Sequence, residues 1–92
     1  MSVRTFRARA LEELFVTGAT KRIAKPQWRK IVLILDSLDG ITDLTDCSGV
    51  MDFHPLKGNR IGAYAMTVTA NWRITFRWNG EEVVDVDYKD YH

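Results

Sequence analysis

The spacing of apolar side chains changes near the middle of the chain, and this change restricts the fold more than any other feature of the sequence. Up to about residue 40, apolar residues recur every three or four positions, the period of a helix buried on one face. From residue 62 onward they alternate with polar residues, the period of half-buried strands. We therefore expect an α+β domain in which two N-terminal helices pack on one face of a mainly antiparallel sheet.

Two helices are predicted in the first half. The first ends at Gly18, a residue type common at helix C-caps. The second has Pro26 in its first turn and ends before Gly40. Their apolar faces consist of Ala10, Leu11, Leu14 and Phe15 in the first helix and of Trp28, Ile31, Val32, Leu35 and Leu38 in the second.

Three strands are expected in the second half, over residues 62–68, 71–78 and 81–88. The apolar faces of neighbouring strands must coincide, and this requirement predicts the register. Three-residue loops over residues 69–71 and 79–81 satisfy it. The predicted partners are Val68 with Trp72, Met66 with Ile74 and Tyr64 with Phe76 in one hairpin, and Phe76 with Val84, Ile74 with Val86 and Trp72 with Tyr88 in the other.

The polar side of this sheet is where function is expected. A short strand over residues 3–6 and a connector over residues 41–52, with one helical turn near Leu44, complete the fold. In the predicted register Arg73 lies opposite Asp87, so the alternative to a functional role is a cross-strand ion pair. The predicted polar side chains are Thr67, Arg73, Thr75, Arg77, Asp85 and Asp87.

Length and composition are those of one packed domain over residues 1–92. The apolar fraction of 46% is ordinary for a globular protein with a single core. No apolar run approaches the roughly 20 residues of a membrane span, and the charged N-terminus lacks the apolar stretch of a secretory signal. A lone Cys47 forms no internal disulfide and is expected to be an inert packing residue. These features predict a cytoplasmic protein without membrane contact.

Positive charge is concentrated at the start of the chain, although the net charge is only +1. Residues 1–30 contain eight Lys and Arg residues against two Glu residues, whereas residues 31–52 contain five Asp residues and no base. Such asymmetry creates a positive surface suited to phosphate groups. The alternative is two solvated helix faces of opposite sign.

Two short segments carry residue types used in acid–base chemistry, FHPLKGNRIG at residues 53–62 and YKDYH at residues 88–92. The first reads as a loop marked by Pro and Gly, and its imidazole and two cations suit a phosphate group. No zinc motif, phosphate-binding glycine motif or serine elbow is present, which leaves metal-free phosphoryl chemistry. The candidate residues are His54, Lys57 and Arg60 in the first segment and Asp90, Tyr91 and His92 in the second.

Three motifs together resemble a known family. HPLKG at residues 54–58, ANWRITF at residues 70–76 and the final YKDYH resemble the HigB group of bacterial toxins, in the RelE/ParE superfamily of type II toxin–antitoxin systems. The resemblance covers nearly the whole chain. It implies the RelE-like microbial ribonuclease fold and a ribosome-dependent endonuclease, an mRNA interferase, that cuts translated mRNA in the ribosomal A site. It also implies a helix-turn-helix antitoxin similar to HigA, through which alone the toxin would contact operator DNA.

The resemblance assigns site residues by position. The catalytic residues become His54, Asp90, Tyr91 and His92. Lys57 and Arg73 fall on basic positions of the same surface, and local chemistry adds Arg60 and Arg77 as phosphate or RNA ligands. No cofactor and no metal are expected. Docking on the ribosome is expected to use Arg4, Arg7, Arg9, Lys21, Arg22 and Lys25.

The implied reaction is attack of a 2′-OH on the adjacent phosphate, which yields a 2′,3′-cyclic phosphate and a 5′-OH. RNA supplies its own nucleophile in this reaction. Either Asp90 or His54 would accept the 2′-OH proton, and His92 would protonate the leaving oxygen, with the acid and base roles interchangeable at this stage. The remaining roles are charge stabilisation for Lys57 and Arg73 and base stacking or orientation for Tyr91.

Two other functions are compatible with the scaffold. ParE-type relatives share it and act by binding DNA gyrase, and a non-catalytic RNA-binding or docking module would use only the basic N-terminal region. The tail favours the nuclease, because a gyrase binder has no need of it. Regular alternation after Tyr88 would turn Asp90 and His92 toward the core, so the nuclease requires the last strand to end or twist near Tyr88.

Overall fold

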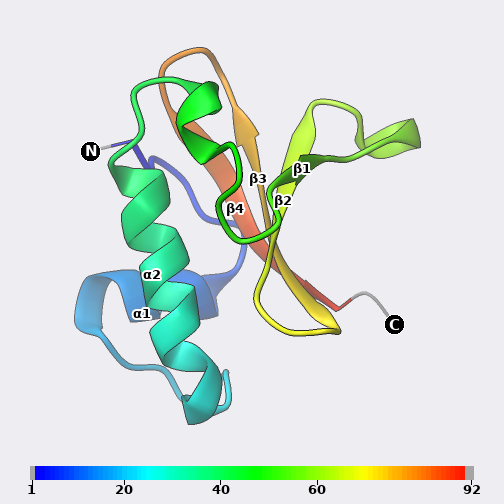
Figure 1. Ribbon diagram of the computed structural model, residues 1–92. Helices are drawn as coiled ribbons and strands as arrows, with labels where there is room; N and C mark the ends of the chain where they lie inside the picture. Colours follow the sequence, from blue (N-terminus) through cyan, green and yellow to red (C-terminus); the bar gives the residue numbers. More distant parts are fainter. Residues whose placement is uncertain (1, 91–92) are drawn as a thin grey trace.

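The computed structural model of the protein describes residues 2–90. Met1, Tyr91 and His92 lie outside the described residues, and so do the predictions that fall on Tyr91 and His92. Within residues 2–90, two helices and a four-stranded antiparallel sheet form the predicted α+β fold. Figure 1 shows both helices on the same side of the sheet.

The helices α1 (Arg9–Thr17) and α2 (Trp28–Asp39) match the two predicted helices. Gly18 ends α1 with a φ of 82°, a conformation that glycine adopts without the steric cost of a Cβ atom. Gly40 follows α2 as predicted, with a right-handed conformation. The register of α2 also buries Ile34, which lies one turn after Ile31 and was missing from the predicted apolar face.

Three 3₁₀ turns connect these elements. The first is η1 (Lys25–Gln27), which leads directly into α2, so the predicted N-terminal Pro26 lies in this tighter turn. The second is η2 (Leu44–Cys47), the turn predicted near Leu44. The third, η3 (Gly58–Arg60), lies between the first two strands.

The strands pair in the order β1-β2-β3-β4. The hairpin of β2 and β3 has the predicted register, because Met66 pairs with Ile74 and Tyr64 with Phe76. The two-residue strand β1 was not predicted, since its residues were read as a loop. The strand bounds are β1 (His54–Pro55), β2 (Ala63–Thr67), β3 (Trp72–Trp78) and β4 (Val83–Asp90).

The predicted register of β3 and β4 is wrong. Trp78 pairs with Val83, which leaves a four-residue loop, and Ile74 pairs with Tyr88 instead of Val86. A β-bulge shifts the register between these pairs, so that Asp85 and Val86 together lie opposite Phe76. The bulge brings both Val83 and Val86 to the buried face, which regular alternation cannot do.

The N-terminal segment, residues 2–7, runs parallel to β4 and binds along it. Val3 and Phe6 form isolated bridges with Val83 and Val86 in place of the predicted regular strand. The N–H of Arg4 donates to the Val83 carbonyl at 2.8 Å, and further bonds follow along the segment. The segment therefore covers one edge of the sheet, and β1 forms the other edge.

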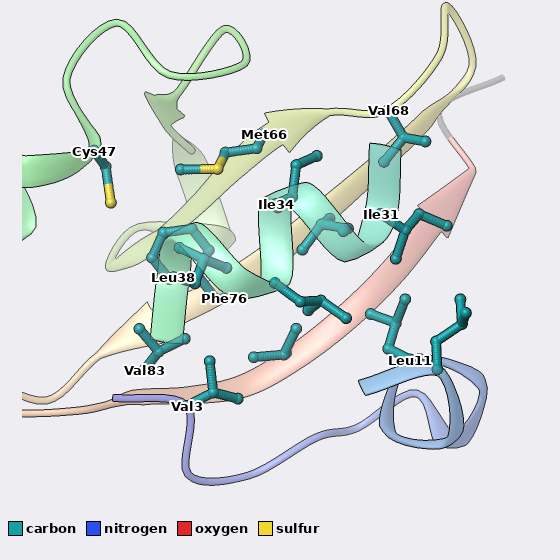
Figure 2. Packing of buried hydrophobic residues seen from close by; sticks show 14 of the residues in the cluster. Val3, Leu11, Ile31, Ile34, Leu38, Cys47, Met66, Val68, Phe76 and Val83 are labelled. Atoms are coloured by element: carbon teal, nitrogen blue, oxygen red, sulfur yellow. The ribbon is translucent and has the colours of Figure 1, made fainter. Parts of the chain in front are cut away.

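The core lies between the helices and the sheet. Figure 2 shows Ile31, Ile34 and Leu38 of α2 above Phe76 and Val83 of the sheet. These side chains are buried, and their burial is the main favourable contribution to folding. The core also contains the side chains of Val3, Leu11, Leu14, Met66, Val68, Ile74 and Val86.

Cys47 lies in this core with a free thiol. Burial raises the pKa of the Cys47 thiol, and the neighbouring Asp46 carboxylate adds to the increase. The thiol is therefore neutral and packs as a small apolar group, as predicted. No helix within residues 2–90 combines the length and the apolar character that a membrane crossing requires.

Candidate active site on the polar face

The side chains of β1–β4 that point away from α1 and α2 form the polar face. The registers place His54 opposite Ala65, Ala65 opposite Thr75 and Thr75 opposite Asp87. Directly paired residues share a face, so these four form one row across the sheet. At the usual strand spacing, His54 and Thr75 are roughly 10 Å apart at their Cα atoms.

His54 is oriented by the turn that precedes it. The Nδ1–H of His54 donates to the carbonyl oxygen of Asp52 at 2.7 Å. Met51 and Asp52 both have positive φ, 46° and 58°, and the N–H of Phe53 closes the turn on the Val50 carbonyl at 2.9 Å. Positive φ at both central residues is the pattern of a type I′ turn, which favours Gly, Asn or Asp and disfavours Met. This turn is therefore a strained segment next to the candidate catalytic histidine.

A hollow of about 280 Å³ lies beside this row on the polar face. Its lining includes Thr75, which belongs to the row, and the charged residues around it are mainly basic. Asp87 forms an ion pair with Lys89, with Oδ2 and Nζ 3.2 Å apart. The hollow keeps an excess of positive charge, which suits an anionic ligand. Its charged residues are Arg7, Arg60, Arg77, Lys89, Asp85 and Asp87.

The predicted phosphate ligands are divided between the hollow and its surroundings. Arg60 and Arg77 line the hollow. Arg73 lies on the polar face opposite Lys89, not opposite Asp87, and its guanidinium Nη1 donates to the Thr69 carbonyl at 2.7 Å. Lys57 is exposed at the start of η3, beyond the end of β1.

Through Asp90, β4 lacks the end or twist near Tyr88 that convergence of the predicted catalytic residues requires. The strand continues regularly through Asp90, which pairs with Trp72, and does not end at Tyr88. Direct pairing places Asp90 on the same face as Trp72, and Asp90 is exposed there at the margin of the sheet. The catalytic partners predicted to follow it, Tyr91 and His92, lie outside the described residues.

Packing of Tyr88 holds the C-terminal end of β4 in place. Tyr88 stacks on Trp72 with ring centroids 4.5 Å apart and an interplanar angle of 15°. The Tyr88 hydroxyl donates to Oε1 of Gln27, at the start of α2. Burial raises the pKa of Tyr88 to about 12. Tyr88 is thus an anchor between sheet and helix, and it keeps its proton at neutral pH.

The six basic residues predicted for ribosome docking have different surroundings. Arg7 lines the hollow, because the N-terminal segment carries it past the bulge of β4. Arg22 forms an ion pair with Glu13 at 3.3 Å, and the Lys25 ammonium lies 5.8 Å from the Trp28 ring centroid. The other three side chains, all exposed, are those of Arg4, Arg9 and Lys21.

Several residues of the site escaped sequence reasoning. Arg7 was assigned only to docking, and Lys89 was assigned no role. Asp85 enters the hollow from the bulge, where its φ of 55° is unusual for a residue other than glycine. Asp85 follows two valines, VVD, which interrupt the alternation of the strand. That interruption is the sequence signal of the bulge.

The arrangement of side chains within residues 2–90 does not favour metal binding. Within residues 2–90, no group of three or more His, Cys, Asp or Glu side chains has the arrangement to hold a metal ion. The carboxylates that line the hollow, Asp85 and Asp87, share it with four cationic residues. The chemistry of these residues therefore favours an anion over a metal ion.

Comparison with solved structures identifies the fold. The chain superposes on a YoeB/ParE toxin from Agrobacterium tumefaciens with a TM-score of 0.66, at 19% identity, over 100% of this chain and 99% of that one. A YoeB dimer from Staphylococcus aureus gives a TM-score of 0.61 at 20% identity, with the same coverage. These likenesses establish the RelE-like toxin fold that the sequence motifs predicted.

The sequence comparisons identify the family. Residues 4–92 match the model of the HigB-like toxins, described as RelE-like toxins of the type II toxin–antitoxin system HigB, and the chain belongs to this family. It is 33% identical to Endoribonuclease HigB from Proteus vulgaris over 91 residues, which are 98% of this chain and 99% of that protein. The predicted family is thereby confirmed.

Proposed function

We propose that the protein is a ribosome-dependent mRNA endonuclease, the toxin of a toxin–antitoxin pair, that cuts mRNA in the ribosomal A site. The observation that carries the proposal is the position of His54 on the same face as the cationic hollow. An imidazole beside a phosphate-binding surface is the arrangement that RNA cleavage by an internal 2′-OH requires. The relationship to Endoribonuclease HigB supports the same reaction.

Each residue has a distinct task in the proposed reaction. The 2′ oxygen attacks the adjacent phosphorus, and the bond to the 5′ oxygen breaks. His54 or Asp90 takes the 2′-OH proton, and His92 gives a proton to the leaving 5′ oxygen. Lys57 and Arg73 stabilise the charge on the phosphorane, and Tyr91 stacks on or orients a base. Because the nucleophile is internal, the reaction needs no metal-bound water.

The hollow extends this site along the RNA strand. Arg60, Arg77 and Arg7 supply cations for phosphates beyond the scissile one. Their guanidinium groups bind phosphate in a planar, bidentate geometry that lysine lacks. The exposed basic side chains of the α1–α2 region, with Arg4 and Arg9, would then contact rRNA outside the active site.

A cognate antitoxin is the second partner. Membership of a type II toxin–antitoxin family implies an antitoxin. We propose that it is a helix-turn-helix protein similar to HigA, that it neutralises this toxin, and that it carries the contact with operator DNA. The place of action would then be the cytoplasm, where translating ribosomes and the operon are found.

Mapping of cleavage ends tests the proposal. After brief induction, mRNA is expected to carry new 5′-OH ends at a fixed position within codons, and purified mRNA without ribosomes should stay uncut. The His54→Gln variant should cleave roughly 10²- to 10⁴-fold more slowly, the usual contribution of a general acid or base. Arg29→Gln, a change of one exposed charge on α2, should cleave like the parent protein.

Three kinds of result would contradict the proposal. Cuts without codon phase, or equal cutting of naked mRNA, would exclude a ribosome-dependent reaction. Full growth arrest by a stably folded His54→Gln or His92→Gln protein would remove these residues from the mechanism. Growth arrest with intact mRNA and inhibited gyrase would favour the gyrase-binding alternative.

A further inference from the structure

The two nitrogens of the His54 ring have different roles in the structure. A backbone carbonyl accepts hydrogen bonds and never donates them, so the 2.7 Å contact with the Asp52 carbonyl requires a hydrogen on Nδ1. In a neutral imidazole, Nε2 then has no hydrogen and its lone pair can accept a proton. The contact therefore determines which atom of His54 is basic.

The Asp52 carbonyl reaches this position because of an unfavourable backbone conformation. Met51 and Asp52 have φ values of 46° and 58°, and only the second is a residue type that tolerates this region well. Relaxation of either residue to negative φ would rotate the carbonyl away from the ring. Some other contact must therefore hold the turn in place.

Thr67, at the end of β2, holds the turn with two hydrogen bonds. Its N–H donates to the Met51 carbonyl at 2.8 Å, and its hydroxyl Oγ1 donates to Oδ2 of Asp52 at 3.1 Å. Thr67 lies two residues from Ala65, the direct partner of His54. One strand thus fixes both the backbone of His54 and the turn that orients its ring.

We propose that Thr67 and Asp52 are positioning residues that hold His54 as the Nδ1–H tautomer and make Nε2 the proton acceptor of the reaction. The inference rests on the proposed function and assigns the roles that it leaves open. The 2′-O–H bond breaks as the Nε2–H bond forms, and the new O2′–P bond displaces the 5′ oxygen, which takes its proton from His92. The charged His54 ring keeps its bond to the Asp52 carbonyl, which stabilises the imidazolium.

The tautomer can be measured without any activity assay. Long-range ¹H–¹⁵N spectra of the labelled protein at a pH where imidazole is neutral distinguish a nitrogen that carries hydrogen from one that does not. We expect Nδ1 of His54 to carry the hydrogen and Nε2 to lack it. The spectrum of His54→Gln assigns the signals, since His92 is the only other histidine. The opposite assignment in the wild-type protein would overturn the inference.

Thr67→Val tests the positioning role, because valine keeps the branched shape and loses the hydroxyl. The ¹⁵N shifts should move toward the average of the two tautomers, and kcat for cleavage should fall about 10-fold, less than the full loss of a general base. KM should not change. Thr67→Ser should restore both readouts. Thr45→Val removes a similar hydroxyl bond to an aspartate, Asp43 Oδ1 at 2.9 Å, and should change neither.

The outcomes separate this inference from the proposed function. Unchanged ¹⁵N shifts and unchanged kcat in a folded Thr67→Val protein would overturn the positioning role. A wild-type protein with the expected tautomer but without ribosome-dependent cleavage would overturn the proposed function and leave the tautomer assignment standing. The wild-type spectrum keeps the inference testable even when Thr67→Val does not fold.

Discussion

The two edges of the sheet, called here the β4 side and the β1 side, are stabilised in different ways. On the β4 side, six of the eight strand residues pair with β3 on one flank, and Val83 and Val86 form bridges with the N-terminal segment on the other. On the β1 side, two residues pair with β2, and a strained turn precedes them. Asp90, at the end of β4, lies on the face of Trp72, whereas His54, at the other edge, lies on the polar face with the cationic hollow. The comparison teaches that extended strand pairing positions Asp90, whereas a few individual hydrogen bonds orient the candidate catalytic residue His54.

The largest expected effect concerns the β4 side. Trp72→Ala removes the ring that stacks on Tyr88 and should lower the free energy of unfolding by about 3 kcal/mol. Urea denaturation measures the change. A double-mutant cycle with Trp72→Leu and Tyr88→Leu should give a coupling energy of about 1 kcal/mol. A coupling near zero would show that the stack does not anchor the strand.

An intermediate effect is expected on the β1 side. Met51→Val places a β-branched residue at positive φ and should lower the free energy of unfolding by about 1 kcal/mol. Met51→Gly should stay close to the parent, because relief of strain offsets the greater entropy of the unfolded chain. Hydrogen exchange of the Thr67 amide, which bonds to Met51, measures the local change. Equal exchange in both variants would mean that the turn is not strained.

The smallest effect concerns the pH dependence of the β4 side. Burial raises the pKa of Tyr88 from 10.0 to about 12, so the folded state favours the protonated phenol. The raised pKa of Tyr88 adds to the free energy of unfolding. This stabilisation is complete below pH 10 and is lost as the pH rises toward 12, because the unfolded chain releases the phenol proton first. Tyr88→Phe should therefore show a weaker loss of stability between pH 9 and 11 by urea denaturation. Tyr64→Phe, the matched control, should keep the parent's decline.

The helices and the β2–β3 hairpin were predictable because each depends on local pattern. The apolar spacing of α2 and the alternation through Met66 and Ile74 contain enough information to fix the helix face and the register. The β3–β4 register was not predictable by the same rule. The two valines before Asp85 interrupt the alternation, but this interruption does not show by itself that an extra residue enters the strand there, with Asp85 at positive φ.

The candidate site was predictable in its residue types and less so in its geometry. His54, Arg60 and Arg77 were named from the sequence, and the polar face brings them to one side of the sheet. The contact of Asp52 with the His54 ring was not predictable, because it depends on a turn that places Met51 at positive φ, a conformation that methionine rarely adopts. Arg7 joins the hollow through pairing across most of the chain, which no local pattern reveals.

The pairing of residues 2–7 with β4 also has a consequence for biosynthesis. The Asp85 N–H donates to the Thr5 hydroxyl across 80 positions of sequence. The chain is made from its N-terminus, so its first strand-like segment has no strand to pair with until almost the whole domain has been translated. The sheet, and the polar face with it, is then completed in a late step that closes a long loop.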